Sequence, residues 1–152
     1  MADADPIELR PPMEADRAAW QTLWQAYQAF YRADISAAVS DVTWRRLRDP
    51  AEPMWAVLAH AAEQPVGLVH WIRHRSCWTT GDYVYLQDLF VAPGSRGGGI
   101  GRRLIAHVYA EAQSAGCARV YWLTHETNQA AMRLYDQVAE RSGFVQYRKM
   151  LD

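Results

Sequence analysis

The sequence predicts an α/β (α+β) fold, in which a mixed central sheet carries helices on both of its faces. Segments with the hydrophobic period of a helix alternate with β-rich segments along the 152 residues, and Gly or Pro separates many of them. Tyr83–Val91 is the strongest strand, and its two apolar faces are typical of a central strand covered on both sides. The length fits one compact unit, so we expect residues 1–152 to form a single domain.

The elements before that strand each have a local signal. Ile7–Arg10 is a short strand stopped by two prolines, and acidic residues just after them favour the start of a helix that runs to about Tyr31. A second helix, over about 39–47, ends before Pro50, because the residue before a proline disfavours helical backbone.

The remaining elements follow from the same patterns. The β-rich segments 55–60 and 66–73 predict a hairpin around a short turn. After Val91 we expect a helix over 101–115, a strand over 119–123, a helix over 128–141 and a last strand over Phe144–Met150.

Aromatic residues concentrate on one face of the first predicted helix. They are Trp20, Trp24, Tyr27, Phe30 and Tyr31. Their helical spacing predicts that most of them pack against the sheet. The alternative is an aromatic rim around a pocket for a substrate.

The composition argues against several classes of function. Sixteen Lys and Arg face 17 Asp and Glu, for a formal net charge of −1, so we expect no nucleic-acid partner. No run of about 18 apolar residues predicts a membrane span, and the acidic start Met1–Glu8 lacks the apolar core of a signal peptide. Cys77 and Cys117 form no CxxC pair and suit a reducing cytosol, so we expect a cytoplasmic protein without a metal site.

The most informative segment is the glycine-rich loop Val91–Leu104, VAPGSRGGGIGRRL, which joins the strongest strand to a helix. The first N–H groups of a helix have no partner within it, and together with the helix dipole they form an anion site. After Ser95 no Asp, Asn, Ser or Thr is placed to cap this helix, and Arg102 and Arg103 oppose its dipole. Both features suit a helix start whose missing negative charge comes from a bound phosphate.

The glycine spacing argues against two common phosphate loops. A Walker A loop needs a lysine where Ile100 stands. A dinucleotide GxGxxG motif fails because Arg102 or Leu104, depending on the register, occupies its third glycine position. The pattern that fits is [RQ]-x-x-G-x-[GA], formed by Arg96, Gly99 and Gly101.

With this pattern the chain resembles the acetyl-CoA loop of the Gcn5-related N-acetyltransferase (GNAT) superfamily, and its longer motifs resemble the Hpa2-like and diamine acetyltransferase members. The resemblance covers roughly Trp55 to the end and is carried by Tyr85–Val91, Val120–Thr124, Asn128, Leu134–Asp136 and Gly143-Phe144. It implies the GNAT fold with a mostly antiparallel sheet, and N-acetyltransferase activity with acetyl-CoA as cosubstrate. Because Hpa2-like enzymes are often dimers, it also makes a homodimer plausible.

The resemblance further implies roles for individual residues. The cofactor-binding residues would be Leu89, Phe90, Val91, Arg96, Gly97, Gly98, Gly99, Ile100, Gly101, Arg102, Asn128 and Tyr135. Tyr135 matches the general acid that protonates the departing CoA thiolate, and a phenol with a pKa of about 10 suits that task. By pattern alone, Tyr135 could instead belong to an apolar helical stripe, and Asn128 could be a helix N-cap.

The sequence departs from these relatives at the catalytic base. A primary amine with a pKa of ~10.4 must lose a proton before it can attack. The Hpa2-like and diamine enzymes typically place a glutamate where this chain has Gln87, and Gln87 can orient a water but cannot accept a proton. Asp88 follows, but strand alternation predicts it on the opposite face of the sheet. Glu126 and His125 are the other candidates for the base.

We therefore expect an enzyme that moves an acetyl group from acetyl-CoA to a primary amine by direct attack in a ternary complex. The acceptor would be a polyamine, an amino acid or a lysine side chain. The alternative is a catalytically weak acyl-CoA-binding or sensor module, which Gln87 favours and Tyr135 opposes.

Overall fold

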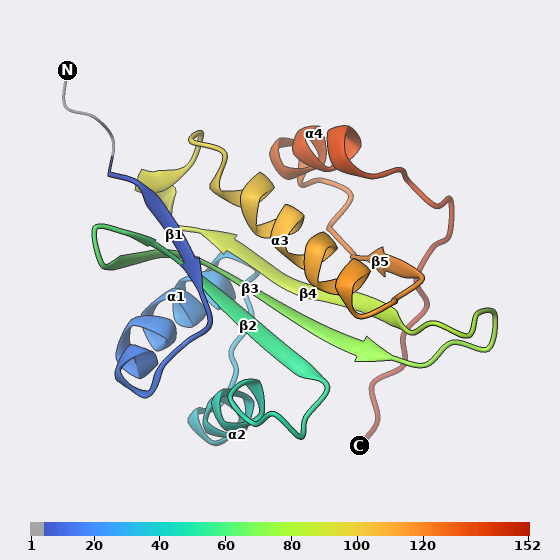
Figure 1. The fold of residues 1–152 in the computed structure, drawn as a ribbon, viewed down its shortest axis with the longest axis horizontal. Coiled ribbons are helices and arrows are strands. Elements are labelled where there is room, and N and C mark those ends of the chain that lie inside the picture. Colours follow the sequence, from blue (N-terminus) through green and yellow to red (C-terminus); the bar gives the residue numbers. More distant parts are fainter. Residues whose placement is uncertain (1–4) are drawn as a thin grey trace.

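A five-stranded sheet forms the centre of the molecule (Figure 1), in a computed structural model that describes residues 5–152. The first four residues of the acidic start Met1–Glu8 lie outside the described residues. In spatial order the strands are β1 (Ile7–Arg10), β2 (Met54–Ala61), β3 (Gln64–His74), β4 (Tyr83–Val91) and β5 (Arg119–Tyr121). Neighbouring strands are antiparallel except β4 and β5, which are parallel. The predicted mixed, mostly antiparallel sheet is confirmed.

Helices cover both faces of this sheet, as predicted. They are α1 (Arg17–Phe30) and α2 (Ala37–Leu47) on one face, and α3 (Ile100–Ser114) and α4 (Gln129–Val138) on the other (Figure 1). Two short 3-10 turns, η1 (Glu14–Asp16) and η2 (Pro93–Ser95), precede α1 and α3. Strand alternation supplies both cores, because Leu58 and Leu68 pack under α1 and α2 while Val57 and Val69 pack under α3. Among residues 5–152, no helix combines the length and apolar character needed to cross a bilayer.

A β-bulge in β4 decides which of its side chains face α1. His70 pairs with Asp88 but the next residue, Trp71, pairs with Leu86, so Gln87 is an extra residue in β4. An extra residue breaks the simple alternation of faces. Leu86 packs in the core under α3, whereas the Asp88 side chain contacts His70 on the α1 side. The strict alternation assumed for residues 87 and 88 was therefore wrong at this point.

The pairing of β4 with β5 is short. Only Tyr83–Tyr85 of β4 pair with Arg119–Tyr121 of β5. The predicted strand over 119–123 therefore ends two residues early. Among residues 5–152, no strand lies beside the second half of β4 on that edge. The two strands separate after Tyr85 and Tyr121, before β4 reaches the glycine-rich loop.

The predicted last strand, Phe144–Met150, does not form. The helix before it ends at Val138 instead of Arg141, and the chain from there to Asp152 has no regular secondary structure. The large apolar side chains Phe144, Val145, Tyr147 and Met150 are all exposed. The local pattern favoured a strand, but a strand also needs a neighbour with which it forms backbone hydrogen bonds. Among residues 5–152, no strand pairs with this segment.

Candidate active site

The glycine-rich loop has the backbone geometry of an open, uncapped helix start. Gly97 and Gly99 have φ of 86° and 80°, in the left-handed region that only glycine adopts without strain. Gly99 is the N-cap of α3, no side chain caps the helix, and its first turn holds no acidic residue. A Cβ atom on Gly97, Gly98 or Gly99 would meet no other atom of residues 5–152 within 4 Å. The unpartnered N–H groups of α3 therefore begin beside an open surface.

Two arginines tie this loop to its neighbours. Arg96 Nε donates a hydrogen bond to the carbonyl oxygen of Val91 at 2.9 Å, and its guanidinium lies 5.6 Å from the ring centres of both Phe30 and Phe90. Arg102 donates a hydrogen bond to the side-chain oxygen of Gln137 on α4. The loop is thus fixed to the end of β4 on one side and linked to α4 on the other.

A cavity of about 590 Å³, the loop groove, lies between the glycine-rich loop, the end of β4 and α4. It brings together nearly all residues predicted to bind a cofactor: Leu89, Phe90, Val91, Arg96, Gly97, Gly99, Ile100, Gly101, Arg102, Asn128 and Tyr135. Gly98 is not among the residues that line it. Asn128 stands at the N-cap position of α4, but its side chain makes no capping bond, and its Nδ2 lies 3.4 Å from Thr124 Oγ1.

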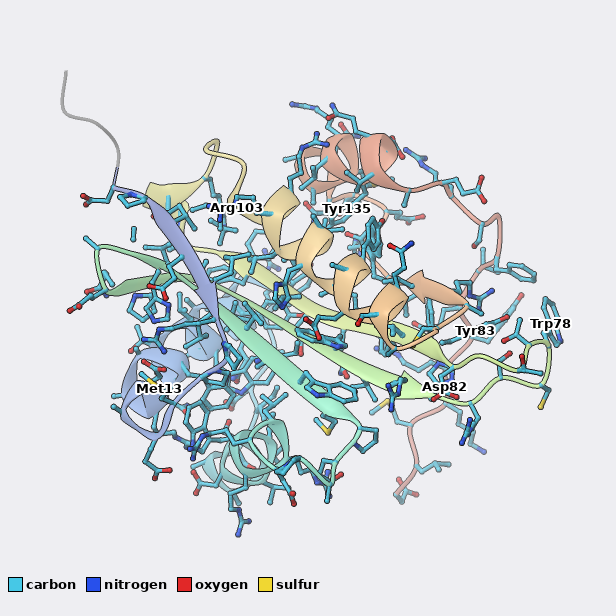
Figure 2. All side chains as sticks on the ribbon, viewed as in Figure 1. Met13, Trp78, Asp82, Tyr83, Arg103 and Tyr135 are labelled. Atoms are coloured by element: carbon cyan, nitrogen blue, oxygen red, sulfur yellow. The ribbon has the colours of Figure 1, made fainter. Side chains whose placement is uncertain are left out.

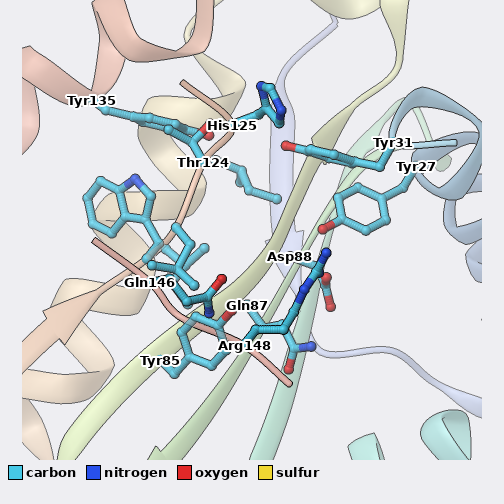
Figure 3. Close-up of a pocket in the computed structure, with 14 residues that line it drawn as sticks. Tyr27, Tyr31, Tyr85, Gln87, Asp88, Thr124, His125, Tyr135, Gln146 and Arg148 are labelled. Carbon is cyan, nitrogen blue, oxygen red and sulfur yellow. The ribbon is translucent and has the colours of Figure 1, made fainter. Parts of the chain in front are cut away.

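A second cavity of about 530 Å³, the tyrosine pocket, lies beside the groove (Figure 3). Four tyrosines line it: Tyr27, Tyr31, Tyr85 and Tyr135. The aromatic face of the first helix therefore has two roles, since Trp20 and Trp24 are core residues while Tyr27 and Tyr31 form the rim that was the alternative expectation. The charged or titratable side chains of the lining besides tyrosine are Asp88, His125 and Arg148.

The two cavities meet at three residues. Tyr31, Leu89 and Tyr135 line both the loop groove and the tyrosine pocket. Tyr135 projects from the side of α4 that packs on the sheet, where its ring makes an edge contact with Trp122 at 5.4 Å (Figure 2). Burial, with a smaller contribution from Tyr31, raises the pKa of Tyr135 to about 12. Its phenol therefore keeps its proton at neutral pH.

The candidate catalytic bases differ in whether they line the tyrosine pocket. Gln87 and His125 line the tyrosine pocket. Glu126 is exposed and lines neither cavity, so the structure does not bring it to the site. Asp88, which alternation had placed elsewhere, lines the pocket and is only 7% exposed. The sequence signal that could have located it is an acidic residue inside an otherwise apolar strand.

The negative charge of Asp88 reaches the surrounding phenols. Burial first, and then Asp88, raises the pKa of Tyr27 far above its ordinary value, and the Tyr27 hydroxyl points toward the Asp88 carboxylate (Figure 3). The pKa of Tyr85 is raised by burial and then by Asp88. No group of three or more His, Cys, Asp or Glu suited to a metal ion occurs among residues 5–152. The pocket thus holds the Asp88 carboxylate among neutral phenols, with the Arg148 guanidinium also in its lining.

Comparison with known proteins assigns this arrangement to a family. The model of the acetyltransferase (GNAT) family matches residues 20–139, and the chain belongs to that family. The D-amino-acid N-acetyltransferase HPA3 of Saccharomyces cerevisiae is 34% identical over 147 residues, which are 95% of this chain and 91% of that protein. The chain is thus an acetyltransferase, and its relatives support N-acetylation.

Other matches are shorter or more distant. The thialysine N-epsilon-acetyltransferase of Mus musculus is 35% identical over 78 residues, 48% of this chain and 45% of that protein, so this match spans less than half of it. Among solved structures, the aminoglycoside N-acetyltransferase AAC(6')-Iy in complex with CoA has a TM-score of 0.82 at 17% identity, with 99% of each chain covered. An aminoglycoside acetyltransferase from an uncultured soil metagenomic sample has a TM-score of 0.81 at 18% identity, covering 96% of this chain and 97% of that one. These structures share the fold.

Proposed function

We propose that this acetyltransferase moves the acetyl group of acetyl-CoA to the primary amine of a small molecule, by direct attack while both substrates are bound. The observation that carries the proposal is the junction of the loop groove and the tyrosine pocket at Tyr135. One cavity has an anion site and the other has a carboxylate among tyrosines, so a phosphorylated donor and a cationic acceptor can meet beside one phenol.

The loop groove fits acetyl-CoA. Coenzyme A carries a diphosphate, and the uncapped N-terminus of α3 offers N–H groups and a favourable dipole for it. The left-handed Gly97 and Gly99 leave room for close approach, because side chains there would project into open space. Bound acetyl-CoA would supply an activated acetyl thioester, and Arg96, Arg102 and Asn128 would hold it from the walls of the groove.

Tyr135 is suited to protonate the sulfur of the departing CoA. Its phenol lines both cavities, and its raised pKa, about 12, keeps it protonated at neutral pH, so a proton is available when the carbon–sulfur bond breaks. The packing of its ring on Trp122 does not conflict with this role, because only the hydroxyl has to reach the reacting groups.

Among possible acceptors we favour an amino acid. It presents an ammonium and a carboxylate, and the tyrosine pocket contains both Asp88 and Arg148. A polyamine would leave Arg148 without a counter-ion. The name of HPA3, a D-amino-acid N-acetyltransferase, agrees with this choice. In Arg148→Gln, KM should rise about 10-fold or more for an amino acid, the value of a charge-assisted hydrogen bond, but little for the matching amine without the carboxylate.

The decisive experiment measures thiol release from acetyl-CoA with a panel of amino acids, polyamines and lysine peptides, next to calorimetry with CoA. Turnover with free amino acids is expected. Binding of CoA without turnover on any amine would favour the sensor module instead, and absence of CoA binding at millimolar concentration would contradict the assignment of the groove.

We also propose a homodimer. The support is the segment after α4, where Phe144, Val145, Tyr147 and Met150 are exposed on an unpaired stretch of chain, as is typical of residues that find their partner in a second copy. Light scattering after gel filtration should give twice the mass of 17.3 kDa. Tyr147→Asp should shift it toward the monomer, and a wild-type monomer at all concentrations would refute the dimer.

A further inference from the structure

A buried chain of three side chains connects α1 to the tyrosine pocket. Trp20 Nε1 lies 3.0 Å from His70 Nε2, and His70 Nδ1 lies 2.9 Å from Asp88 Oδ2. Trp20 is fully buried, His70 is 3% exposed and Asp88 is 7% exposed. At the outer end of this hydrogen-bonded series, the Asp88 carboxylate lines the tyrosine pocket.

The chemistry of these groups fixes the position of each proton. An indole N–H can only donate, so His70 Nε2 must accept from Trp20 and carries no proton. The proton of a neutral imidazole is then on Nδ1, which donates to the Asp88 carboxylate. His70 is therefore a neutral donor and not a cation that could balance the charge of Asp88.

Within the described part of the chain, no Lys or Arg side chain forms an ion pair with Asp88. Among residues 5–152, His70 is the one basic side chain within ion-pair distance of Asp88. The other titratable groups around the pocket are Tyr27 and Tyr31 from the α1 segment, Tyr85 on β4, Tyr135 on α4, His125, and Arg148, which makes no ion pair with Asp88. A buried carboxylate without a directly paired cation is unfavourable. A cation entering the pocket would remove that cost.

We infer that Asp88 receives the ammonium group of the acceptor and takes its proton, the role that Gln87 cannot fill. The inference rests on the proposed acetyl transfer. The bulge at Gln87 makes it possible, because it turns Asp88 toward α1 and the pocket. His70 and Trp20 are positioning residues, which hold the carboxylate in one orientation at the wall of the pocket, where the Tyr27 hydroxyl also points toward it (Figure 3).

The step balances in protons and bonds. The ammonium gives one proton to Asp88, and the neutral amine forms a carbon–nitrogen bond to the acetyl carbon while the carbon–sulfur bond breaks. The sulfur takes the proton of Tyr135, and the tyrosinate regains a proton from the new amide nitrogen. Asp88 then releases its proton to water, so one proton leaves for each acetyl group transferred.

The test compares Asp88→Asn with Asp41→Asn, the same change at an exposed position on α2. Each variant is assayed with two acceptors at one pH: a strongly basic amine, present as ammonium, and a weakly basic amine that is already neutral. For Asp88→Asn we expect kcat/KM to fall about 100-fold or more with the basic amine, the usual effect of a general base, and less than about 5-fold with the neutral one. Asp41→Asn should match the wild type with both.

A second readout does not depend on turnover. Calorimetry in the presence of CoA should show weaker binding of the basic amine to Asp88→Asn, with CoA affinity unchanged. Asp88→Glu, which retains the charge, covers the case in which the amide variant does not fold, and it should keep the preference for the basic amine. If kcat/KM of Asp88→Asn fell equally with both amines, or fell less than about 3-fold with the basic amine, the role of Asp88 would be overturned. Absence of transfer by the wild type to every amine would instead overturn the proposed function itself.

Discussion

The side chain of Arg96 returns to the strand that precedes it, and its Nε donates a 2.9 Å hydrogen bond to the carbonyl oxygen of Val91. This bond closes the segment between β4 and α3, so the loop geometry depends on a planar donor as well as on a positive charge. Arg96→Lys keeps the charge but loses this donor geometry. We expect acetyl-CoA affinity to fall about 10-fold, measured by calorimetry, from a bond worth about 1.5 kcal/mol.

Arg45→Lys, at an exposed position in the last turn of α2, is the matched control and should leave that affinity unchanged. Equal affinities of Arg96→Lys and the wild type would show that the Arg96–Val91 bond does not shape the site.

The loop glycines should differ sharply from one another in their tolerance of alanine. Gly99 has φ of 80°, so Gly99→Ala should lower the free energy of unfolding by about 1–2 kcal/mol, the cost of left-handed backbone. Gly98 has no positive φ and open space around it, so Gly98→Ala should stay within about 0.5 kcal/mol of the wild type. Urea denaturation measures both, and similar losses in the two variants would contradict this account of the loop.

Tyr135→Phe removes the phenol that lies between the two cavities. We expect kcat to fall about 100-fold, the usual contribution of a general acid, while acetyl-CoA affinity changes little because the ring remains packed on Trp122. Tyr83→Phe, on β4 outside both cavities, should keep full activity. A large loss of acetyl-CoA binding in Tyr135→Phe, with kcat retained, would give Tyr135 a structural role only.

The pH dependence of Tyr135 follows from burial. Its pKa rises to about 12, because the buried neutral phenol is favoured over the phenolate. A raised pKa extends the pH range of the acid form upward, so kcat should show no decline from Tyr135 ionisation until pH approaches about 12, well above the ~10 of a free tyrosine. A pH–rate profile of the folded enzyme checks this, and a loss of kcat centred near pH 10 and absent from Tyr135→Phe would contradict it.

The buried hydrogen bonds of His70 should contribute to the free energy of unfolding. His70→Phe keeps a ring beside Trp20 and Trp24 but leaves the Trp20 N–H and the Asp88 carboxylate without their partner. We expect a loss of about 2–4 kcal/mol in the free energy of unfolding. Because His70 orients Asp88, His70→Phe should also lower kcat/KM with the basic amine, and His70→Asn, whose amide can still donate toward Asp88, should recover part of that loss.

The control for the two His70 variants is His107→Phe, at a half-buried position on α3. There the free energy of unfolding should change by less than about 0.5 kcal/mol. If His70→Phe were as stable as the wild type, the three-residue chain would not be a structural unit.

Local signals in the sequence were sufficient for most elements. The bounds of β1 and β4 were predicted correctly, because prolines or a glycine-rich loop stop apolar strands there. The uncapped start of α3 was also predictable, since a missing cap and the glycine spacing are local features. The bulge at Gln87 was not, because it is defined only by the register between β3 and β4. The position of Asp88 depended on that register, and so did the pairing of His70 with it.

The end of the chain shows the other limit. The pattern in Phe144–Met150 is that of a strand, but pairing depends on which edge is within reach, and no local property of the segment specifies that. Glu126 is next in sequence to His125, which lines the tyrosine pocket, but its own side chain is exposed and lines neither cavity.

The short ladder between β4 and β5 also has a dynamic consequence. Three residue pairs attach β5 to the sheet, and α4 follows β5 along the chain. Amide protons of β5 and α4 should therefore exchange with deuterium earlier than those of β2 and β3 at the centre of the sheet. A ligand in the loop groove would contact both the end of β4 and α4 and so hold these two elements together. CoA should therefore slow exchange in α4 more than in α2.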